Sequence, residues 1–208
     1  MDRNNVIVTI GRQTGSNGRE IGQLLAKTLG VKCYDRELLA LAAKEGGFDE
    51  KVVEHHDEKP TSSFLYSLYM SSVPFSYSGS SPLADLPLDH KIFLAQFDAI
   101  HRIADSENCV IVGRCADYAL EKRDNVLSVF ILADEEDKVK RIAEREQCSA
   151  DKAREMMLKG DRKRSSYYNY YTNRRWGTAD NYDLCINSSR FTTEGCVNMI
   201  LTAIDAGK

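Results

Sequence analysis

This sequence has no excess of basic residues and no long apolar run. Its 28 lysines and arginines are balanced by 31 acidic residues, for a net charge of -3 at pH 7, so it lacks the positive field that attracts nucleic acid nonspecifically. No apolar segment approaches membrane-spanning length, and the one near the N-terminus is too short for a signal peptide. We therefore expect a cytoplasmic protein that binds neither nucleic acid nor membrane.

The sequence also lacks the spacings of a metal or redox centre. No CxxC pair occurs among the six cysteines, and the four histidines show no ligand spacing with carboxylates or thiols. A structural or solvated role is expected of the histidines, and the sequence leaves any metal ligand undetermined. Reduced, mostly buried thiols are expected at Cys33, Cys109, Cys115, Cys148, Cys185 and Cys196.

Proline is scarce and confined to one section. All four prolines lie between residues 60 and 87, around the serine-dense stretch SSFLYSLYMSSVPFSYSGSS. Such a section is too long for a simple connection within a domain. Its Phe, Leu, Tyr and Met side chains between residues 64 and 70 are too apolar for a linker. The section is therefore either a mobile lobe inserted into the domain or a partly disordered loop, and we favour the lobe.

Outside that section, short β-branched runs alternate with helical patterns. Each predicted strand is followed by a segment with helical spacing, and the last such segment, 193–206, closes the chain. Strands alternating with helices in a chain of 208 residues predict a single α/β domain with a parallel sheet. The predicted strands are residues 6–10, 31–35, 109–114, 127–134 and 182–189.

Between the first strand and its helix lies the segment GRQTGSNGREIG, residues 11–22. In a phosphate-binding P-loop, G-x-x-x-x-G-K-[ST], backbone N–H groups surround phosphates at the positive end of the following helix. With Gly18 as the second glycine, Gln13 stands in place of the first. Arg19 then replaces the lysine and supplies its charge, and Glu20 replaces the hydroxyl residue. The backbone cradle would consist of Gly15, Ser16, Asn17 and Gly18.

Alternatives stay open for this segment. A glycine-bearing turn between a strand and a helix can serve packing alone. Glu20 could hold a metal ion directly or through water, but a carboxylate at a helix N-terminus is also a favourable partner of the helix dipole. The segment therefore indicates phosphate binding without assigning the metal.

Three stretches of the chain, in order, resemble one known family. TIGRQTGSNGREIG (9–22), YDREL (34–38) and VGRCADYALEKRDNVLSVFILADEEDKVKRIAER (112–145) are similar to the cytidylate kinase-like family, a branch of the P-loop nucleoside monophosphate kinases. YDLCINSS (182–189) extends the resemblance over nearly the whole chain. The resemblance is weakest between residues 59 and 90.

The resemblance implies a single P-loop kinase domain with a three-layer α/β/α fold and a parallel sheet. Its core would comprise residues 1–45, 91–134 and 180–208, with a helical acceptor-binding insertion at about 46–90 and a helical lid at about 135–179. ATP would be the co-substrate, together with Mg²⁺, and the acceptor a small phosphate-bearing molecule. The oligomeric state is left open.

The resemblance also implies an acceptor site. Cytidylate kinases carry a G-R-D motif whose arginine contacts the acceptor phosphate, and Gly113 and Arg114 match it here, while Cys115 occupies the aspartate position. Asp35 matches an acidic residue at the monophosphate site of those enzymes. Arg36 fits the kinase-like subset of the family. These residues are the expected acceptor-binding group.

Charged residues of the expected lid lie at helical spacing. Arg141 and Arg145 are four residues apart on a helix that Asp134 should cap. Asp161 and Arg164 are three apart and match a lid motif, D-x-x-R, whose arginine reaches the donor and acceptor phosphates in the family. With Arg19, these four residues are the candidate catalytic set, because phosphoryl transfer depends on arginines that stabilise charge. A solvated helix face is the alternative for Arg141 and Arg145.

The segment SSYYNYYTNRRWG, residues 165–177, is dense in aromatic side chains. Tyrosines interleaved with arginines can stack bases, as in single-strand binders. Tyrosines at near-helical spacing more often pack a helix against the body of a protein, with their hydroxyl groups in solvent. We favour this second interpretation.

The sequence thus predicts an ATP-dependent phosphotransferase that moves the γ-phosphoryl group of ATP to a nucleoside monophosphate, with CMP or dCMP as the leading acceptor. Another small-molecule acceptor is an alternative, because the acceptor lobe matches least and Cys115 removes a polar contact. A nucleotide-binding sensor without catalysis is a further alternative, motivated by the missing lysine. Arg114, Asp161 and Arg164 argue against it, because a pure binder would not need them.

Overall fold

A parallel sheet forms the centre of the molecule. The computed structural model describes residues 3, 5–35, 37–49, 51–53 and 87–207. Its strands run in the order β2-β3-β1-β4-β5, and every neighbouring pair is parallel. The five strands and the parallel sheet predicted from the sequence are confirmed. The strands are β1 (Ile7–Arg12), β2 (Lys32–Tyr34), β3 (Cys109–Val112), β4 (Val126–Leu132) and β5 (Leu184–Asn187).

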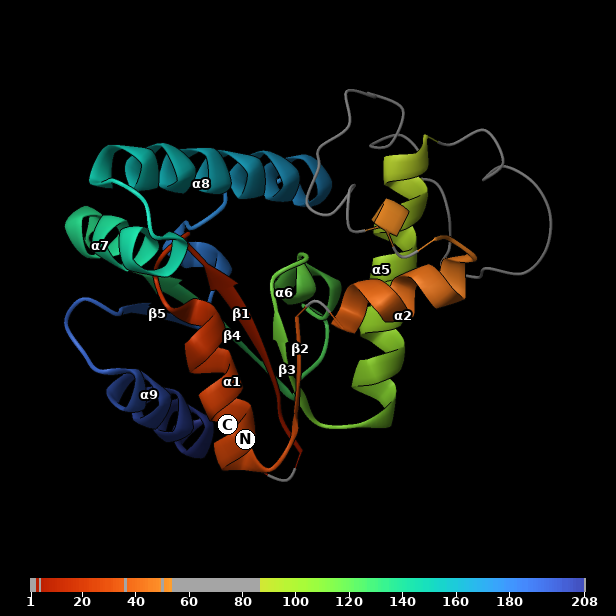
Figure 1. Cartoon of the computed structure of the whole chain (residues 1–208). Helices are drawn as coiled ribbons and strands as arrows, with labels where there is room; N and C mark the ends of the chain where they lie inside the picture. The colour runs from red at the N-terminus through yellow and green to blue at the C-terminus, as the bar shows by residue number, and fades with distance from the viewer. Residues whose placement is uncertain (1–2, 4, 36, 50, 54–86, 208) are drawn as a thin grey trace.

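Helices cover both faces of this sheet (Figure 1). On one face lie α1 (Gly18–Leu29) and α9 (Thr193–Ala206), and on the other α5 (Leu88–Ser106), α6 (Ala116–Ala119) and the end of α8 (Ala150–Thr172). Alternate residues of β1 serve the two cores: Val8 packs with α1 and α9, whereas Ile7 packs with α5 and α6. A strand buried on both faces must be apolar throughout, which explains its β-branched sequence.

Two further helices and a short 3₁₀ turn also lie in the described part of the chain. α2 (Glu37–Gly46) packs against α5, and α7 (Glu135–Glu146) packs against the first half of α8. A short 3₁₀ turn, Ala179–Asn181, precedes β5. The expected lobe lies largely outside the described residues, which omit 54–86. Within the described ranges, no helix has the length and apolar character of a membrane span.

The aromatic segment after residue 164 is part of the core. Tyr167, Tyr168 and Tyr171 on α8 are buried, and the ring of Tyr171 stacks on Phe93 of α5 with centroids 3.9 Å apart. Packing was therefore the right interpretation of this segment, but the expectation of solvated hydroxyl groups was wrong. The hydroxyl groups donate hydrogen bonds within the protein instead: Tyr167 to Gln96 Oε1, Tyr168 to Asp117 Oδ2, and Tyr171 to the Asp89 carbonyl.

α8 is one continuous helix that also crosses the loop between β1 and α1. Ser149 caps its N-terminus by accepting a hydrogen bond from the backbone N–H of Lys152. At Gly160 the helix lies so close to the loop that an added Cβ would sit 2.5 Å from Thr14 Oγ1. The glycine therefore permits direct contact between the helix backbone and the loop.

Gly160→Ala tests this close contact. Alanine inside a helix is normally more stable than glycine by about 1 kcal/mol, but here the new methyl group would overlap Thr14. We expect a lower free energy of unfolding, measured by urea titration. Gly195→Ala in α9 is the matched control, since its Cβ would meet nothing closer than 3.4 Å. Equal stabilisation by both substitutions would contradict the close approach.

Candidate functional site

The loop between β1 and α1 has a backbone that few side chains permit. Gly15 has φ +82°, and an added Cβ would lie 2.8 Å from the carbonyl oxygen of Lys138. Asn17 is left-handed, with φ 58°, and α1 begins at Gly18. Ser16 is fully buried and donates from its Oγ to the Gln13 carbonyl at 2.9 Å. The small residues at 15–18 are therefore required by the shape of the loop.

Two segments from the far end of the chain hold the carbonyl groups of this loop. Arg141 on α7 donates to the Gly15 carbonyl at 3.3 Å and to the Ser188 carbonyl at 3.0 Å. Ser188, just after β5, donates from its Oγ to the Ser16 carbonyl at 2.7 Å. The loop is consequently fixed in shape by contacts from α7 and the end of β5.

A second group of contacts joins the loop to α8. The backbone N–H of Thr14 donates to Asp161 Oδ1 at 2.6 Å, and Arg164 donates to Thr14 Oγ1 at 3.0 Å. The buried ammonium of Lys138 lies 3.1 Å from Gln13 Oε1 and 3.8 Å from Asp161 Oδ2. A carboxylate and a buried cation therefore meet at the loop, where an anionic ligand would experience both.

The carboxylate of Asp35, which follows β2, lies close to three arginine side chains near the carboxyl ends of β1 and β3. Asp35 accepts from Arg114 Nη1 at 2.6 Å, and Arg19 Nε lies 2.9 Å from its other oxygen. Arg12 Nη2 is 4.0 Å away. The side chain of Arg114 is only 3% exposed and that of Asp35 10%. A buried pair of this kind must be satisfied on both sides, because an unpaired buried charge is costly.

Glycines make room for Arg12. A Cβ on Gly113 would overlap the guanidinium group of Arg12, and a Cβ on Gly18 would lie 2.5 Å from the Arg12 Cβ. Gly113 also has φ +83°. The Gly113-Arg114 pair therefore has two tasks: the glycine admits one arginine, and the next residue supplies another.

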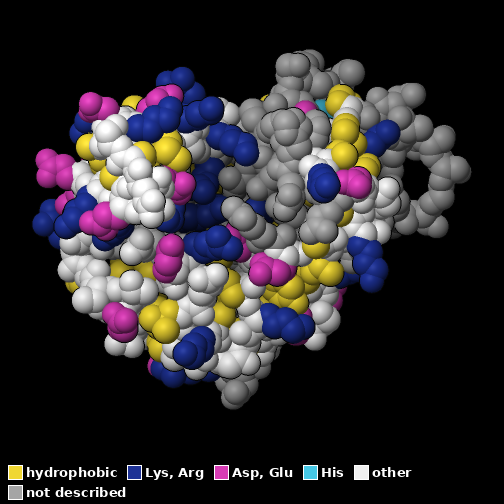
Figure 2. Space-filling model, in the orientation of Figure 1, with side chains coloured by type: hydrophobic (Ala, Val, Ile, Leu, Met, Phe, Trp, Pro, Cys, Tyr) yellow, Lys and Arg dark blue, Asp and Glu magenta, His cyan; other side chains and the backbone are white. Residues whose placement is uncertain are grey.

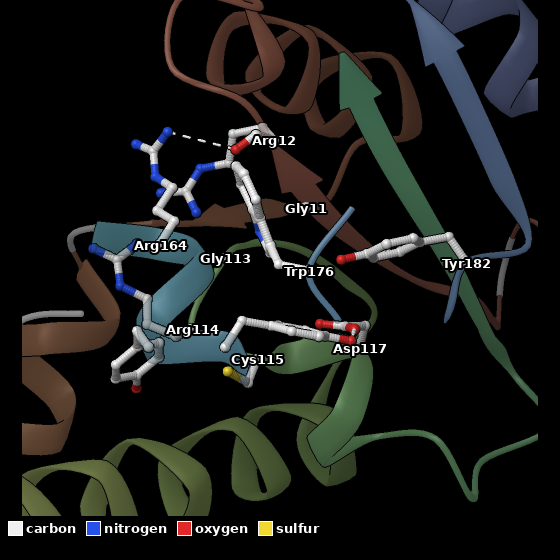
Figure 3. A pocket seen from close by; sticks show the side chains of 11 residues that line it. Gly11, Arg12, Gly113, Arg114, Cys115, Asp117, Arg164, Trp176 and Tyr182 are labelled. Carbon is white, nitrogen blue, oxygen red and sulfur yellow. Dashed lines mark hydrogen bonds between the residues drawn. The ribbon is translucent and has the colours of Figure 1, made fainter. Parts of the chain in front are cut away.

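The arginines open onto a pocket. In Figure 2, lysine and arginine side chains gather in a hollow on the face of the molecule below α8. Figure 3 shows Arg12, Arg114 and Arg164 on one side of the pocket, with Asp117 and Tyr182 on the other. The space amounts to about 290 Å³ and is open to solvent. The pocket is thus positive at one side and carries a carboxyl group at the other.

Asp117 has an unusual environment. Desolvation raises the pKa of its carboxyl group from 3.8 to about 6, although a hydrogen bond from the Tyr168 hydroxyl, at 2.7 Å, acts in the opposite direction. Burial and the neighbouring carboxylate also raise the pKa of Tyr168. Perturbed acids in a pocket are frequent at functional sites, although structural networks produce them too.

The structure brings most of the predicted site residues together in two groups. Gly15, Ser16, Arg141, Asp161 and Arg164 meet at the loop, and Arg19, Asp35 and Arg114 meet at the carboxyl ends of the strands. Asn17 and Gly18 form the start of α1, and Glu20 is exposed in its first turn.

One predicted residue lies elsewhere, and a second falls outside the described part of the chain. Arg145 is in the last turn of α7, half exposed, and its Nε lies 2.9 Å from the adjacent Glu146. Arg36 is outside the described residues. Asp134 occupies the predicted N-cap position of α7 but makes no capping hydrogen bond with its side chain, because Oδ1 accepts from Asn187 instead.

Sequence reasoning missed three residues of the site: Arg12, Lys138 and Ser188. Arg12 had a signal, since a Gly-Arg pair ends β1 just as one follows β3. Lys138 and Ser188 had none, because nothing in a charged helix or a serine pair shows contact with a loop more than a hundred residues away. Among the described residues, no group of three His, Cys, Asp or Glu side chains is placed to hold a metal ion.

Comparison with known proteins gives consistent matches. A family model described as the cytidylate kinase-like family matches residues 7–190. A cytidylate kinase of Archaeoglobus fulgidus is 27% identical over 207 residues, which span 97% of this chain and 96% of that protein. A cytidylate kinase of Methanococcus vannielii is 35% identical over 119 residues, but the match spans 56% of this chain and only 66% of that protein.

Solved structures agree on the fold. An uncharacterized protein from Eubacterium ventriosum has a TM-score of 0.71 and 30% identity, with 97% of this chain and 99% of that one covered. A shikimate kinase from Bacteroides thetaiotaomicron has a TM-score of 0.55 and 14% identity, covering 96% of this chain and 98% of that one. A gluconokinase from Sinorhizobium meliloti has a TM-score of 0.53 and 13% identity, covering 99% and 94%. The predicted P-loop kinase fold is confirmed.

Asp35→Asn tests the carboxylate that gathers the arginines. Removing its charge leaves Arg114 buried without an ionic partner, so we expect a loss of about 3 kcal/mol or more in the free energy of unfolding. Inorganic phosphate should restore more stability to this variant than to the wild type. Asp105→Asn is the matched control, because Asp105 is 67% exposed where it pairs with Arg123, and it should cost under about 1 kcal/mol. Equal effects would contradict a central role for Asp35.

Asp117→Asn tests the raised pKa. The folded-state pKa of about 6 exceeds the ordinary 3.8, so ionised Asp117 destabilises the folded protein above pH 6, and this penalty disappears as the pH falls below about 4. Asparagine can still accept the hydrogen bond from Tyr168. We expect the variant to be more stable than the wild type by about 1 to 3 kcal/mol near pH 8, with a shrinking difference toward pH 4. Thermal unfolding across this range measures it; a constant difference would refute the shift.

Proposed function

Since this chain belongs to the cytidylate kinase-like family, we propose that it transfers the γ-phosphoryl group of ATP to a small phosphate-bearing acceptor, with CMP or dCMP as the leading candidate. One observation supports this proposal most directly. Arg12, Arg19 and Arg114 converge on Asp35 beside a glycine-bearing loop at a helix N-terminus. Such a cluster fits two phosphate groups that must be brought together.

The donor side of the proposed site is the loop before α1. The backbone of Gly15, Ser16, Asn17 and Gly18 would surround the phosphates of ATP at the positive end of the helix. ATP would enter as its magnesium complex, and Glu20, exposed in the first turn of α1, is the side chain available there for the metal, directly or through water.

The acceptor side consists of Asp35 and Arg114, to which we add Arg12. Without a ligand, Asp35 offsets the charge of the arginines. A dianionic phosphate entering the cluster would pair with the guanidinium groups, whose planar donors suit phosphate oxygens. The Arg19 side chain extends from the loop to Asp35, so it would lie between donor and acceptor.

Transfer requires an acceptor oxygen to attack the γ-phosphorus while the bond to the β-phosphate oxygen breaks. Little covalent chemistry falls to the protein, whose task is to position both groups and stabilise the charge between them. Arg19 and Arg164 would serve the transferred group, and Arg141 would keep the loop in shape. We place Lys138 in the same set, since its buried ammonium lies at the loop and can offset phosphate charge in place of the missing lysine.

α8 would act as the lid. Asp161 accepts from the loop N–H of Thr14, and Arg164 contacts the same residue. In the closed lid these contacts would help to keep water from the loop, which would protect ATP from hydrolysis. Arg145 lies at the exposed end of α7. It could contact the phosphates of a bound nucleotide only after a movement of the lid.

The two alternative functions lead to different results. Another acceptor within the same reaction is favoured by Cys115, which lies in a buried, left-handed position where cytidylate kinases carry an aspartate. A nucleotide sensor without catalysis is disfavoured by the arginine cluster, because binding alone does not require charge on the acceptor side.

The activity test is a panel assay. The protein is incubated with magnesium-ATP and CMP, dCMP, UMP, AMP, GMP, shikimate or gluconate, and ADP is measured. We expect acceptor-dependent ADP with a nucleoside monophosphate. ADP formation only with a non-nucleotide would indicate another acceptor, and ATP binding without any ADP formation would indicate the sensor.

Arg114→Ala then tests the acceptor assignment. We expect the KM of the acceptor to rise at least about tenfold, the value of one charge-assisted contact, while the KM of ATP changes little. Arg123→Ala is the matched control, because Arg123 pairs with Asp105 at the surface. Unchanged acceptor kinetics in Arg114→Ala would refute this assignment.

A further inference from the structure

The side of the pocket opposite the arginines is built from three elements. Asp117 comes from α6, Tyr168 from α8, and Tyr182 from the segment before β5. The indole of Trp176 also lines the pocket and packs edge-on against Phe130. No role for these residues follows from the phosphate chemistry, which the arginines supply.

Tyr182 carries a polar group that the fold does not use. Its side chain is buried, with 9% of the residue exposed, yet its hydroxyl group forms no hydrogen bond with any residue that the structure describes. Burial and the neighbouring Asp117 raise the pKa of Tyr182. The nearby Gly177 backbone and Tyr168 hydroxyl act in the opposite direction, although neither meets the geometry of a hydrogen bond with the Tyr182 hydroxyl. A buried hydroxyl without a partner is costly, and such groups are uncommon in folded proteins.

The Asp117 carboxylate has hydrogen-bond acceptor sites that the described part of the protein does not occupy. An ionised carboxylate offers about four lone-pair sites. The Tyr168 hydroxyl occupies one of them, on Oδ2, and the backbone N–H groups of residues 117 and 118 also lower its pKa. As a residue Asp117 is partly exposed, and it lines the pocket beside Tyr182 (Figure 3). A ligand could therefore donate to Asp117 and bond to Tyr182 at the same time.

Aromatic side chains also line the pocket. They belong to Tyr167, Tyr168 and Trp176. Aromatic walls favour a planar ring, through stacked or edge-on contacts. A ring edge that carries an N–H donor next to a hydrogen-bond acceptor matches the carboxylate and the hydroxyl group together.

We propose that Asp117 and Tyr182 bind the nitrogenous base of the acceptor, whose phosphate is held by Arg12 and Arg114. This inference rests on the proposed function for the phosphate position, and it narrows the acceptor to a nucleoside monophosphate. A sugar phosphate has no planar ring and would leave the aromatic side chains of the pocket without a stacking partner. Asp117, the carboxylate that would select the base, lies two residues after Cys115. Cys115 itself is the position at which cytidylate kinases carry their aspartate.

An internal role for the same residues makes different predictions. Asp117 and Tyr168 join α6 to α8, and Tyr182 could merely fill space beside them. In that case Tyr182→Phe would leave ligand binding unchanged, and Asp117→Asn would act on stability alone.

Tyr182→Phe is the decisive variant, since it removes only the unpartnered oxygen. Titration calorimetry, without ATP, measures the affinities of CMP, UMP, AMP, GMP, ribose 5-phosphate and inorganic phosphate. We expect the wild type to bind at least one of the four nucleotides more tightly than ribose 5-phosphate. The variant should lose about five- to tenfold in affinity for that nucleotide, the value of one hydrogen bond, without loss for ribose 5-phosphate or of thermal stability.

Tyr171→Phe is the matched control. It is the same chemical change at a buried tyrosine of α8 that does not line the pocket, and it should leave all the affinities unchanged. Asp117→Asn provides a second measurement. Wild-type affinity for the nucleotide should fall below pH 6 more steeply than that of Asp117→Asn, because the phosphate titrates in both proteins but the carboxyl group only in one.

Three outcomes would overturn the inference. They are equal affinity of the wild type for ribose 5-phosphate and all four nucleotides, unchanged nucleotide affinity in Tyr182→Phe, and an equal loss for every ligand including phosphate. Failure of the proposed function is a separate result. Selective nucleotide binding that depends on Tyr182, without ADP formation from ATP, would leave this inference standing and refute the phosphotransferase.

Discussion

The carboxylate of Asp35 determines how the positive charge of this molecule is arranged. Arg114 is almost wholly buried and would be unstable without an anion, and Asp35 lies 2.6 Å from it. The same group binds Arg19 and attracts Arg12, so four charged groups from three strand ends and one helix share one place. The glycines at 18 and 113 follow from this arrangement, because Arg12 would not fit beside any side chain there. Removing Asp35 would therefore disturb the loop and the strand ends together.

The fold was predictable because its determinants are local. β1, β3 and β4 are buried on both faces, so each is rich in apolar and β-branched residues, and Gly30 ends α1 in a left-handed conformation. Of the residues that gather at the candidate site, the sequence indicated Gly15 through its local motif, and Asp35 and Arg114 through the family resemblance. Lys138 and Ser188 reach the loop through tertiary packing of α7 and β5. Arg145, one turn beyond Arg141, shows that helical spacing alone did not indicate which arginine faces the loop.

Helix α8 links the two halves of the site. Its first half packs on α7, Asp161 and Arg164 contact the loop, and Tyr167, Tyr168 and Tyr171 anchor its end in the core. As the proposed lid, α8 could pivot only about its anchored end, so opening would separate Asp161 and Arg164 from the loop while Tyr168 stays bonded to Asp117. The Asp117 side of the pocket would thus be present in both states, whereas the phosphate side would be completed on closure.

The loss of the usual lysine from the loop is best understood as a redistribution of charge. Arg19 takes its place in the sequence but pairs with Asp35, while the buried Lys138 lies near Asp161. Arg19 and Lys138 thus each have a carboxylate nearby, which compensates their charge in a site of low dielectric. A phosphate entering this site exchanges one anion for another instead of meeting an unpaired cation. Its affinity is then the difference between two strong interactions, so selectivity must come from groups that are satisfied only by the ligand. Tyr182 is such a group.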